Sequence, residues 1–212
     1  MSISRLSFIP LYFVSFSMDH TGESRNKPGL KKYASELTLD PSTANRFLSL
    51  SEGNRKVTRQ RKERDYPSTQ ERFDECNQVL SKEDLGGRHY LEIECLHDVH
   101  IGMAYKRLER NGAGDNVTLG RNADSWALYA SKDKFYAQHE TIIHNLRLPE
   151  IKSDESYRIG VFLDRPAGLL SFNKISSESD KLTHLYTFHT TFTEPLYLGL
   201  RLQSPTATIS LK

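Results

Sequence analysis

Short runs of β-branched and aromatic residues, separated by turn sequences, fill the chain from residue 30 onward. In the segment Tyr90–Glu94, apolar residues alternate with acidic ones. A period of two is typical of a strand with one buried face, whereas a helix repeats every ~3.6 residues. Turn-forming pairs such as Gly86-Gly87 and Asn111-Gly112 lie between the runs. Many short strands at such spacing predict an all-β fold, a sandwich of two antiparallel sheets.

The same patterns locate the elements of this fold. A helical stretch is expected at Lys31–Leu37, with a short helical turn near Glu71–Leu80. Asp164–Gly168 is expected to form a β-turn between two central strands. Trp126 and Phe172 are expected in the core, because large aromatic side chains bury the most area. The expected strands are Phe47–Ser51, Lys56–Arg59, His89–Cys95, Val99–Tyr105, Ser125–Ala130, Lys134–Gln138, Arg158–Leu163, Leu169–Ile175, His184–Phe188, Leu196–Leu202 and Ala207–Leu211.

Residues 1–29 are expected to form a hydrophobic leader and a polar linker ahead of the folded domain. Arg5 precedes a mostly apolar run, residues 6–16, which is shorter than the ~20 residues that span a bilayer, so we expect no membrane span. A secretory signal peptide stays open for residues 1–17. A hydrophobic start that packs on the domain and a leader joined to a truncated chain are favoured, because Pro10 interrupts the run and no A-x-A cleavage pattern follows.

The formal charge of +2 and the two cysteines exclude several classes of protein. Two cysteines cannot build a disulfide-dense scaffold or a four-cysteine zinc site, and we expect Cys76 and Cys95 to be free thiols in a cytoplasmic protein. Domains dedicated to nucleic acids are usually strongly basic, so no nucleic acid is expected as a partner. Because the chain lacks a G-x-S-x-G motif and a phosphate-binding glycine loop, we expect no enzyme activity, catalytic residue, cofactor or small-molecule substrate.

Cys95, His97, Asp98 and His100 form the pattern nearest to a metal site. Successive side chains of a strand point to opposite faces, so Cys95 and His97 share a face that His100 does not. A tetrahedral zinc site needs about four convergent ligands. We therefore expect a polar turn here and no metal.

A series of motifs, in order along the chain, resembles a PRY–SPRY domain. The resemblance implies a two-sheet antiparallel β-sandwich of the SPRY, concanavalin-like jelly-roll type, with a short N-terminal helical PRY segment. It implies a domain at residues 30–212, with PRY at about 30–84 and SPRY at about 85–212. Leu91 stands where the family usually has Trp, and another aromatic residue is missing near Cys95; smaller apolar residues can repack at modest cost. The motifs are Leu37–Pro41, Leu48–Ser51, Arg55–Val57, Gly87–Glu94, Ile101–Tyr105, Ser125–Tyr129, Ile159–Asp164, Gly168–Phe172 and Phe192–Tyr197.

The resemblance also implies a function. A rigid sandwich that carries loops is suited to recognition, so we expect a non-enzymatic module that binds a protein partner. The segment Lys27–Tyr33 is similar to the junction before this domain in fish NOD-like receptors, which implies an innate immune role. Tripartite-motif proteins and stonefish-type toxins end in the same module. The substrate-recognition domain of a tripartite-motif-type ubiquitin ligase and a secreted toxin-like module are therefore alternatives.

The partner is expected to contact four loops, at Thr58–Arg72, Lys106–Asp124, Ser131–Pro149 and Lys174–Thr183. Basic residues crowd the segment from Arg55 to Arg64, which favours an acidic protein surface as the partner. A solvated hairpin and loop without a partner is the plainer interpretation of that segment. The candidate partner-binding residues are Arg59, Arg61, Lys62, Arg64, Tyr66, Lys132, Phe135, His139 and Asn173.

Overall fold

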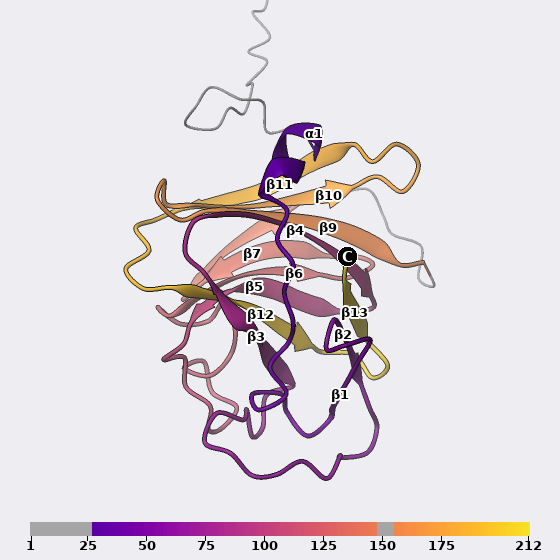
Figure 1. Cartoon of the computed structure of the whole chain (residues 1–212), viewed down its shortest axis with the longest axis vertical. Helices are drawn as coiled ribbons and strands as arrows, with labels where there is room; N and C mark the ends of the chain where they lie inside the picture. The colour runs from indigo at the N-terminus through magenta and orange to yellow at the C-terminus, as the bar shows by residue number, and fades with distance from the viewer. Residues whose placement is uncertain (1–26, 148–154) are drawn as a thin grey trace, which may run out of the picture.

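The computed structural model describes residues 27–147 and 155–212, where the strands form two antiparallel sheets packed face to face (Figure 1). This confirms the all-β sandwich predicted from the sequence. The expected leader, residues 1–17, lies outside the described residues.

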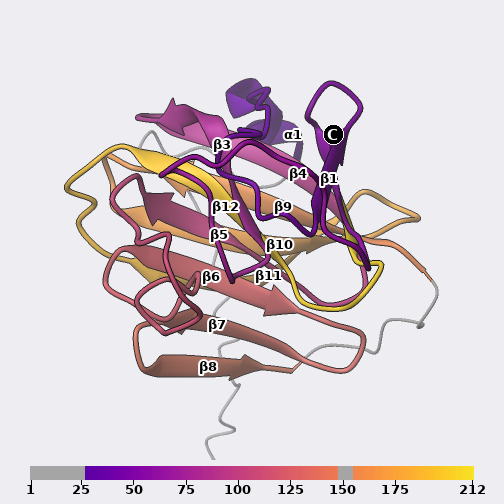
Figure 2. The same ribbon diagram turned by 90° about the horizontal axis from the view of Figure 1, so that it is seen from below.

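Each sheet combines strands from distant parts of the chain. The seven-stranded sheet has the order β1 (Leu48–Ser51), β2 (Lys56–Arg59), β13 (Thr208–Leu211), β4 (Arg88–Leu96), β9 (Tyr157–Asp164), β10 (Leu169–Ile175) and β11 (Leu182–His189). The six-stranded sheet has the order β3 (Gln78–Leu85), β12 (Leu196–Leu202), β5 (Val99–Tyr105), β6 (Ser125–Ala130), β7 (Phe135–His139) and β8 (Ile142–Leu146). Figure 2 shows β8 at the free edge of this second sheet.

The main hydrophobic core fills the space between the two sheets. Trp126 and Phe172 are both buried in it, as predicted. Leu91 and Cys95 are also buried there. Because alternate strand residues face this core, the remaining residues of the six-stranded sheet form its outer face.

The helical predictions were only partly right. The helical residues are α1 (Lys27–Leu30) and a 3-10 turn at Lys31–Tyr33, after which Ala34 pairs with Tyr90 of β4. The helix predicted over Lys31–Leu37 therefore ends early, because the backbone at Ala34 bridges to β4 and Ser35 N donates to Tyr90 O at 3.1 Å. The helical turn predicted near Glu71–Leu80 is wrong. Asn45 Nδ2 donates to the carbonyl oxygens of Phe73 and Asp74, at 3.1 and 2.9 Å, and so holds that backbone in an irregular path.

Two strands were not predicted. β3 contains polar residues, yet Gln78 and Ser81 are buried. β8 lies within the segment Ser131–Pro149 that was expected to be a loop, and its Ile142 and Ile143 are exposed. The turn between β9 and β10 is confirmed: it includes Gly168, whose φ is +68°.

Candidate functional site

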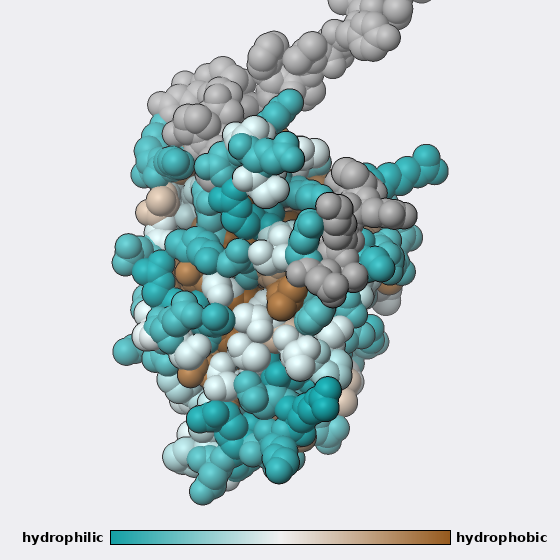
Figure 3. All heavy atoms as spheres, turned by 90° about the vertical axis from the view of Figure 1, so that its right-hand side faces the viewer, coloured by the Kyte–Doolittle hydropathy of each residue, from teal (hydrophilic) through white to brown (hydrophobic). Residues whose placement is uncertain are grey.

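Residues 59–66, here called the basic loop, begin at the last residue of β2 and carry most of the predicted contact residues. The side chains of Arg61, Lys62 and Arg64 are exposed. In the described part of the chain, neither Arg61 nor Lys62 forms an ion pair. Residues 58–64 and Thr206 line an open hollow of about 520 Å³. Hydrophilic residues gather at the lower end of the molecule in Figure 3, at the height where Figure 1 draws this loop.

Tyr66 anchors the basic loop to the domain. Its hydroxyl donates to the carbonyl oxygen of Leu48 at 2.9 Å, and Arg46 Nη1 donates to its carbonyl oxygen at 2.8 Å. The guanidinium of Arg72 lies over its ring, 4.8 Å from the centroid. Arg64 also donates, through Nη1, to Ser49 Oγ at 3.2 Å. The basic loop is thus held at its C-terminal end, and Tyr66 itself is half-buried.

The other predicted residues do not join this loop. Lys132 is exposed in the turn between β6 and β7. Phe135 and Asn173 lie on strands and are only 3% and 8% exposed, so the prediction that they lie in contact loops is wrong. The hydrophobic core explains the burial of Phe135, whose ring packs against that of Tyr157. His139 is half-buried and stacks on Trp126, with ring centroids 4.7 Å apart.

Arg59 connects the basic loop to the six-stranded sheet. Its Nη1 donates to the carbonyl oxygen of Gln203, directly after the end of β12. The outer face of that sheet therefore begins beside the basic loop. Arg201, two residues before Gln203, lies on this outer face, since its neighbours Leu200 and Leu202 are both in the core.

A cross-strand row, defined as Arg201, His100, Tyr129 and Tyr136, runs across the outer face. These residues are direct partners in the register of β12, β5, β6 and β7. The ring of His100 meets the ring of Tyr129 edge-on at 4.9 Å, and the two tyrosine rings stack at 4.6 Å. His100 Nε2 lies 3.4 Å from the hydroxyl of Tyr136. The row places a guanidinium, an imidazole and two phenols side by side.

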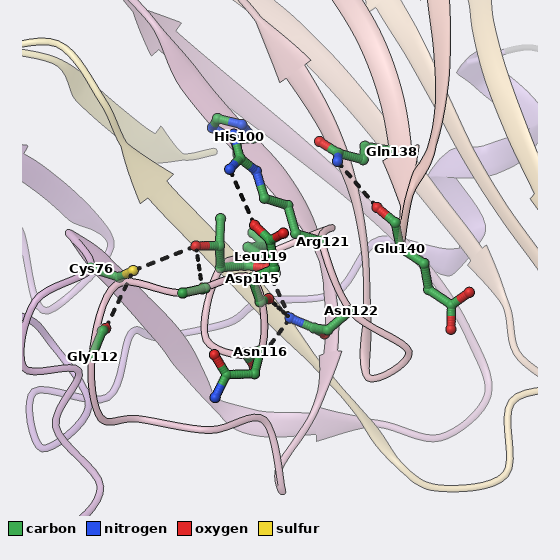
Figure 4. A network of polar contacts seen from close by, with 12 residues as sticks. Cys76, His100, Gly112, Asp115, Asn116, Leu119, Arg121, Asn122, Gln138 and Glu140 are labelled. Carbon is green, nitrogen blue, oxygen red and sulfur yellow. Dashed lines mark hydrogen bonds and ion pairs between the residues drawn. The ribbon is translucent and has the colours of Figure 1, made fainter.

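The connection from β5 to β6, residues 106–124, was predicted as a loop. It packs on the outer face of the sheet beside this row. Leu119 packs closely on Gly199 of β12, since a Cβ added at Gly199 would lie only 2.8 Å from Leu119 Cδ1. Gln78 fixes it further, because its Oε1 accepts from Leu119 N at 2.8 Å and its Nε2 donates to Val117 O at 2.9 Å. Arg121, in the same connection, reaches toward His100 (Figure 4). Asp115 pairs with this arginine, 3.3 Å from its Nη1.

The charge state of the row follows from its burial. Burial, together with the positive charges of Arg201 and Arg121, lowers the pKa of His100 to about 3, so its imidazole is neutral at pH 7. Burial also lowers the pKa of Arg201, and Arg121 and Arg59 act in the same direction. Burial raises the pKa of Tyr136, whose hydroxyl stays protonated. The row thus carries positive charge only on its arginine.

The pattern Cys95–His97–Asp98–His100 does not converge. Cys95 is in the main core, whereas His100 lies on the outer face of the other sheet. Within residues 27–147 and 155–212, no group of three or more His, Cys, Asp or Glu side chains could hold a metal ion. Cys76 and Cys95 are buried free thiols, and burial raises the pKa of Cys95. No helix in the same ranges has the length and apolar character of a membrane span.

Comparison with protein families accounts for this architecture. Residues 37–85 match the PRY model, the SPRY-associated domain, and residues 88–210 match the SPRY domain. The chain belongs to the PRY–SPRY family. This confirms the resemblance found in the sequence.

Two curated relatives match most of this PRY–SPRY chain. Stonustoxin subunit beta of Synanceia horrida is 37% identical over 175 residues, which cover 82% of this chain and 24% of the toxin subunit. Tripartite motif-containing protein 14 of Mus musculus is 36% identical over 186 residues, 86% of this chain and 41% of that protein. The chain therefore spans less than half the length of either curated relative.

A solved structure shows the same fold. The crystal structure of the TRIM65 PSpry domain superposes with a TM-score of 0.74 at 31% identity, covering 86% of this chain and 93% of that one. PRY–SPRY domains are a family of protein-interaction modules, so the relevant chemistry is that of a binding surface.

Proposed function

We propose that this PRY–SPRY domain is a non-enzymatic recognition module that binds an acidic surface of a protein partner through the basic loop. One observation carries the proposal: Arg61 and Lys62 are exposed, without an ion pair in the described residues, on a loop that Tyr66 fixes to the sandwich. Positive side chains held in this way attract an acidic partner. An anchored loop also loses little conformational freedom when the partner binds.

An innate immune role in the cytoplasm is the biological setting that we propose. Support comes from the resemblance of Lys27–Tyr33 to the junction in fish NOD-like receptors and from the similarity to tripartite motif-containing protein 14. The two free cysteines agree with a reducing compartment. A recognition domain of a tripartite-motif-type ubiquitin ligase is the second candidate, and a longer transcript that encodes RING cysteines would favour it.

A toxin-like module is the third candidate, favoured by the 37% identity to stonustoxin subunit beta. Cleavage of residues 1–17 in the mature protein, or a glycan on Asn116, would support that alternative. An uncleaved chain recovered from cytosol would support the cytoplasmic module.

Photo-crosslinking tests the proposed function. A photoreactive residue at position 61 should capture a partner that the same residue at the exposed Lys181 does not capture. The partner, once purified, should bind the Arg61→Gln/Lys62→Gln variant about tenfold more weakly than the wild type, since each exposed interface charge contributes about 0.5–1 kcal/mol. The Lys82→Gln/Lys181→Gln variant removes the same charge elsewhere and should bind as the wild type does. Equal affinity for both double variants would exclude the basic loop as the contact.

A further inference from the structure

The cross-strand row holds a positive charge that the described residues do not balance. Arg201 is half-buried, and among residues 27–147 and 155–212 its guanidinium has no hydrogen bond and no ion pair. The positive charges of Arg121 and Arg59 nearby lower its pKa further, so neither residue balances its charge. A partly buried guanidinium without an acceptor is unfavourable, and a bound anion would remove that cost.

His100 is the buried neighbour of Arg201 on the adjacent strand. Its side chain is 1% exposed, and its Nδ1 has no hydrogen-bond partner in the described part of the chain. Its contact with Tyr136, at 3.4 Å, is a long hydrogen bond. Buried polar atoms nearly always have a partner, so the unpartnered Nδ1 indicates that a further polar group belongs at the site.

Arg121 lies beside His100 and is held by an exposed ion pair. Figure 4 shows its guanidinium beside the ring of His100. Its side chain is 43% exposed and is held by an ion pair to Asp115, which is itself 75% exposed. Exposed ion pairs of this kind contribute at most ~1 kcal/mol, so a competing anion can draw the arginine away from Asp115.

We propose that the cross-strand row, with Arg121, binds one oxyanion of the protein partner: a carboxylate of an acidic peptide segment, or a phosphate on a modified side chain of such a segment. The planar guanidinium of Arg201 can donate two parallel hydrogen bonds to either oxyanion. The tyrosine hydroxyls and the neutral imidazole donate hydrogen bonds without adding charge. This inference rests on the proposed function, because Arg59 joins the row to the basic loop and one acidic partner would cover both.

NMR titration of the ¹³C,¹⁵N-labelled domain tests the assignment. The probes are a short glutamate-glycine peptide, its glutamine-glycine counterpart and a phosphoserine-glycine peptide. The glutamate or the phosphoserine peptide should produce saturable shifts of the ring signals of His100 and Tyr136, and the glutamine peptide should not. Tighter binding of the glutamate peptide would identify a carboxylate as the natural ligand, and tighter binding of the phosphoserine peptide a phosphate.

Three variants make the test specific. Arg201→Gln should weaken binding of the acidic peptide about tenfold or more, since a hydrogen bond to a charged group is lost. Tyr136→Phe removes one hydroxyl, keeps the stacked ring, and should weaken binding by a smaller factor. Lys181→Gln, an exposed site outside the row, should leave affinity unchanged. Thermal melts of all three establish that the variants are folded.

Two outcomes would overturn the inference in distinguishable ways. Peptide shifts confined to residues 59–66, with unchanged affinity of Arg201→Gln, would refute the oxyanion site and leave the basic loop as the contact. Absence of saturable binding by either acidic peptide would refute both the oxyanion site and the acidic partner.

Discussion

The imidazole ring of His139 lies flat on the indole ring of Trp126, with centroids 4.7 Å and planes 14° apart. His139 Nδ1 lies 2.9 Å from the carbonyl oxygen of Ser125, which fixes the ring at the end of β7. His139 was predicted to touch a partner, yet its contacts are those of a residue that covers the core. Its position explains how the end of β7 shields the only tryptophan of the chain.

His139→Ala should therefore change stability more than binding. Loss of a stacked ring pair costs about 1 kcal/mol, and Trp126 should become more exposed, with red-shifted emission. Urea unfolding followed by tryptophan fluorescence measures both effects. Lys132→Ala, in the exposed turn before β7, is the control and should alter the free energy of unfolding by less than ~0.5 kcal/mol. Unchanged emission from His139→Ala would show that the stacking does not shield the indole.

Gly168→Ala should destabilise the domain strongly. Gly168 has a φ of +68°, and a Cβ there would lie 2.0 Å from the carbonyl oxygen of Thr190. The backbone must move, so we expect a loss of about 3 kcal/mol or more in denaturant unfolding. Gly53→Ala is a matched control, because Gly53 has a φ of +64° with nothing within 4 Å of the added Cβ. Its expected cost is only the ~1–2 kcal/mol of the left-handed conformation, and equal costs for the two variants would rule out the close contact.

The strand limits could be predicted where apolar runs end at turns. β5, β6, β10 and β12 match their predicted limits, because their alternate residues fill the core. β3 was missed because its polar residues are buried by hydrogen bonds to distant segments. Gln78, for example, can be buried because its side-chain oxygen and nitrogen both form hydrogen bonds with the connection before β6. Such partners lie far along the chain, so a local pattern could not indicate them.

The candidate site could be predicted only in part. The basic loop is visible in the sequence because its basic residues lie close together along the chain. Arg201, His100, Tyr129 and Tyr136 each lie on a separate strand, and only the sheet register makes them neighbours. A polar residue inside an otherwise apolar strand, as at His100 and Arg201, was the available signal.

Acidic pH should lower the free energy of unfolding of the domain, because His100 is buried in its neutral form. Its pKa falls from 6.5 in the unfolded chain to about 3 in the fold. Between these values the unfolded chain binds the extra proton, so stability is full above pH 6.5 and falls as the pH drops toward 3. Well inside this window the loss is about 1.4 kcal/mol per pH unit. Unfolding of wild type and His100→Gln at pH 5.5 and 4.5 isolates this contribution, since the other groups titrate in both. An equal loss of stability in the wild type and in His100→Gln would contradict a buried, neutral imidazole.

Binding of the crosslinked partner should depend on salt. Exposed charges on the basic loop are screened over ~8 Å at physiological ionic strength, so Kd should rise as salt is added, mainly through slower association. The Arg61→Gln/Lys62→Gln variant should show a weaker salt dependence than the wild type, and stopped-flow association rates measure this. The same salt dependence in both proteins would place the electrostatic contact elsewhere.

Hydrogen–deuterium exchange of the domain, alone and saturated with the purified partner, tests the central claim most directly. The account predicts slower exchange in the basic loop and in the segments of β5, β6, β7 and β12 that carry the cross-strand row. Protection confined to the turn between β10 and β11, residues 176–181, on the other sheet, would contradict it.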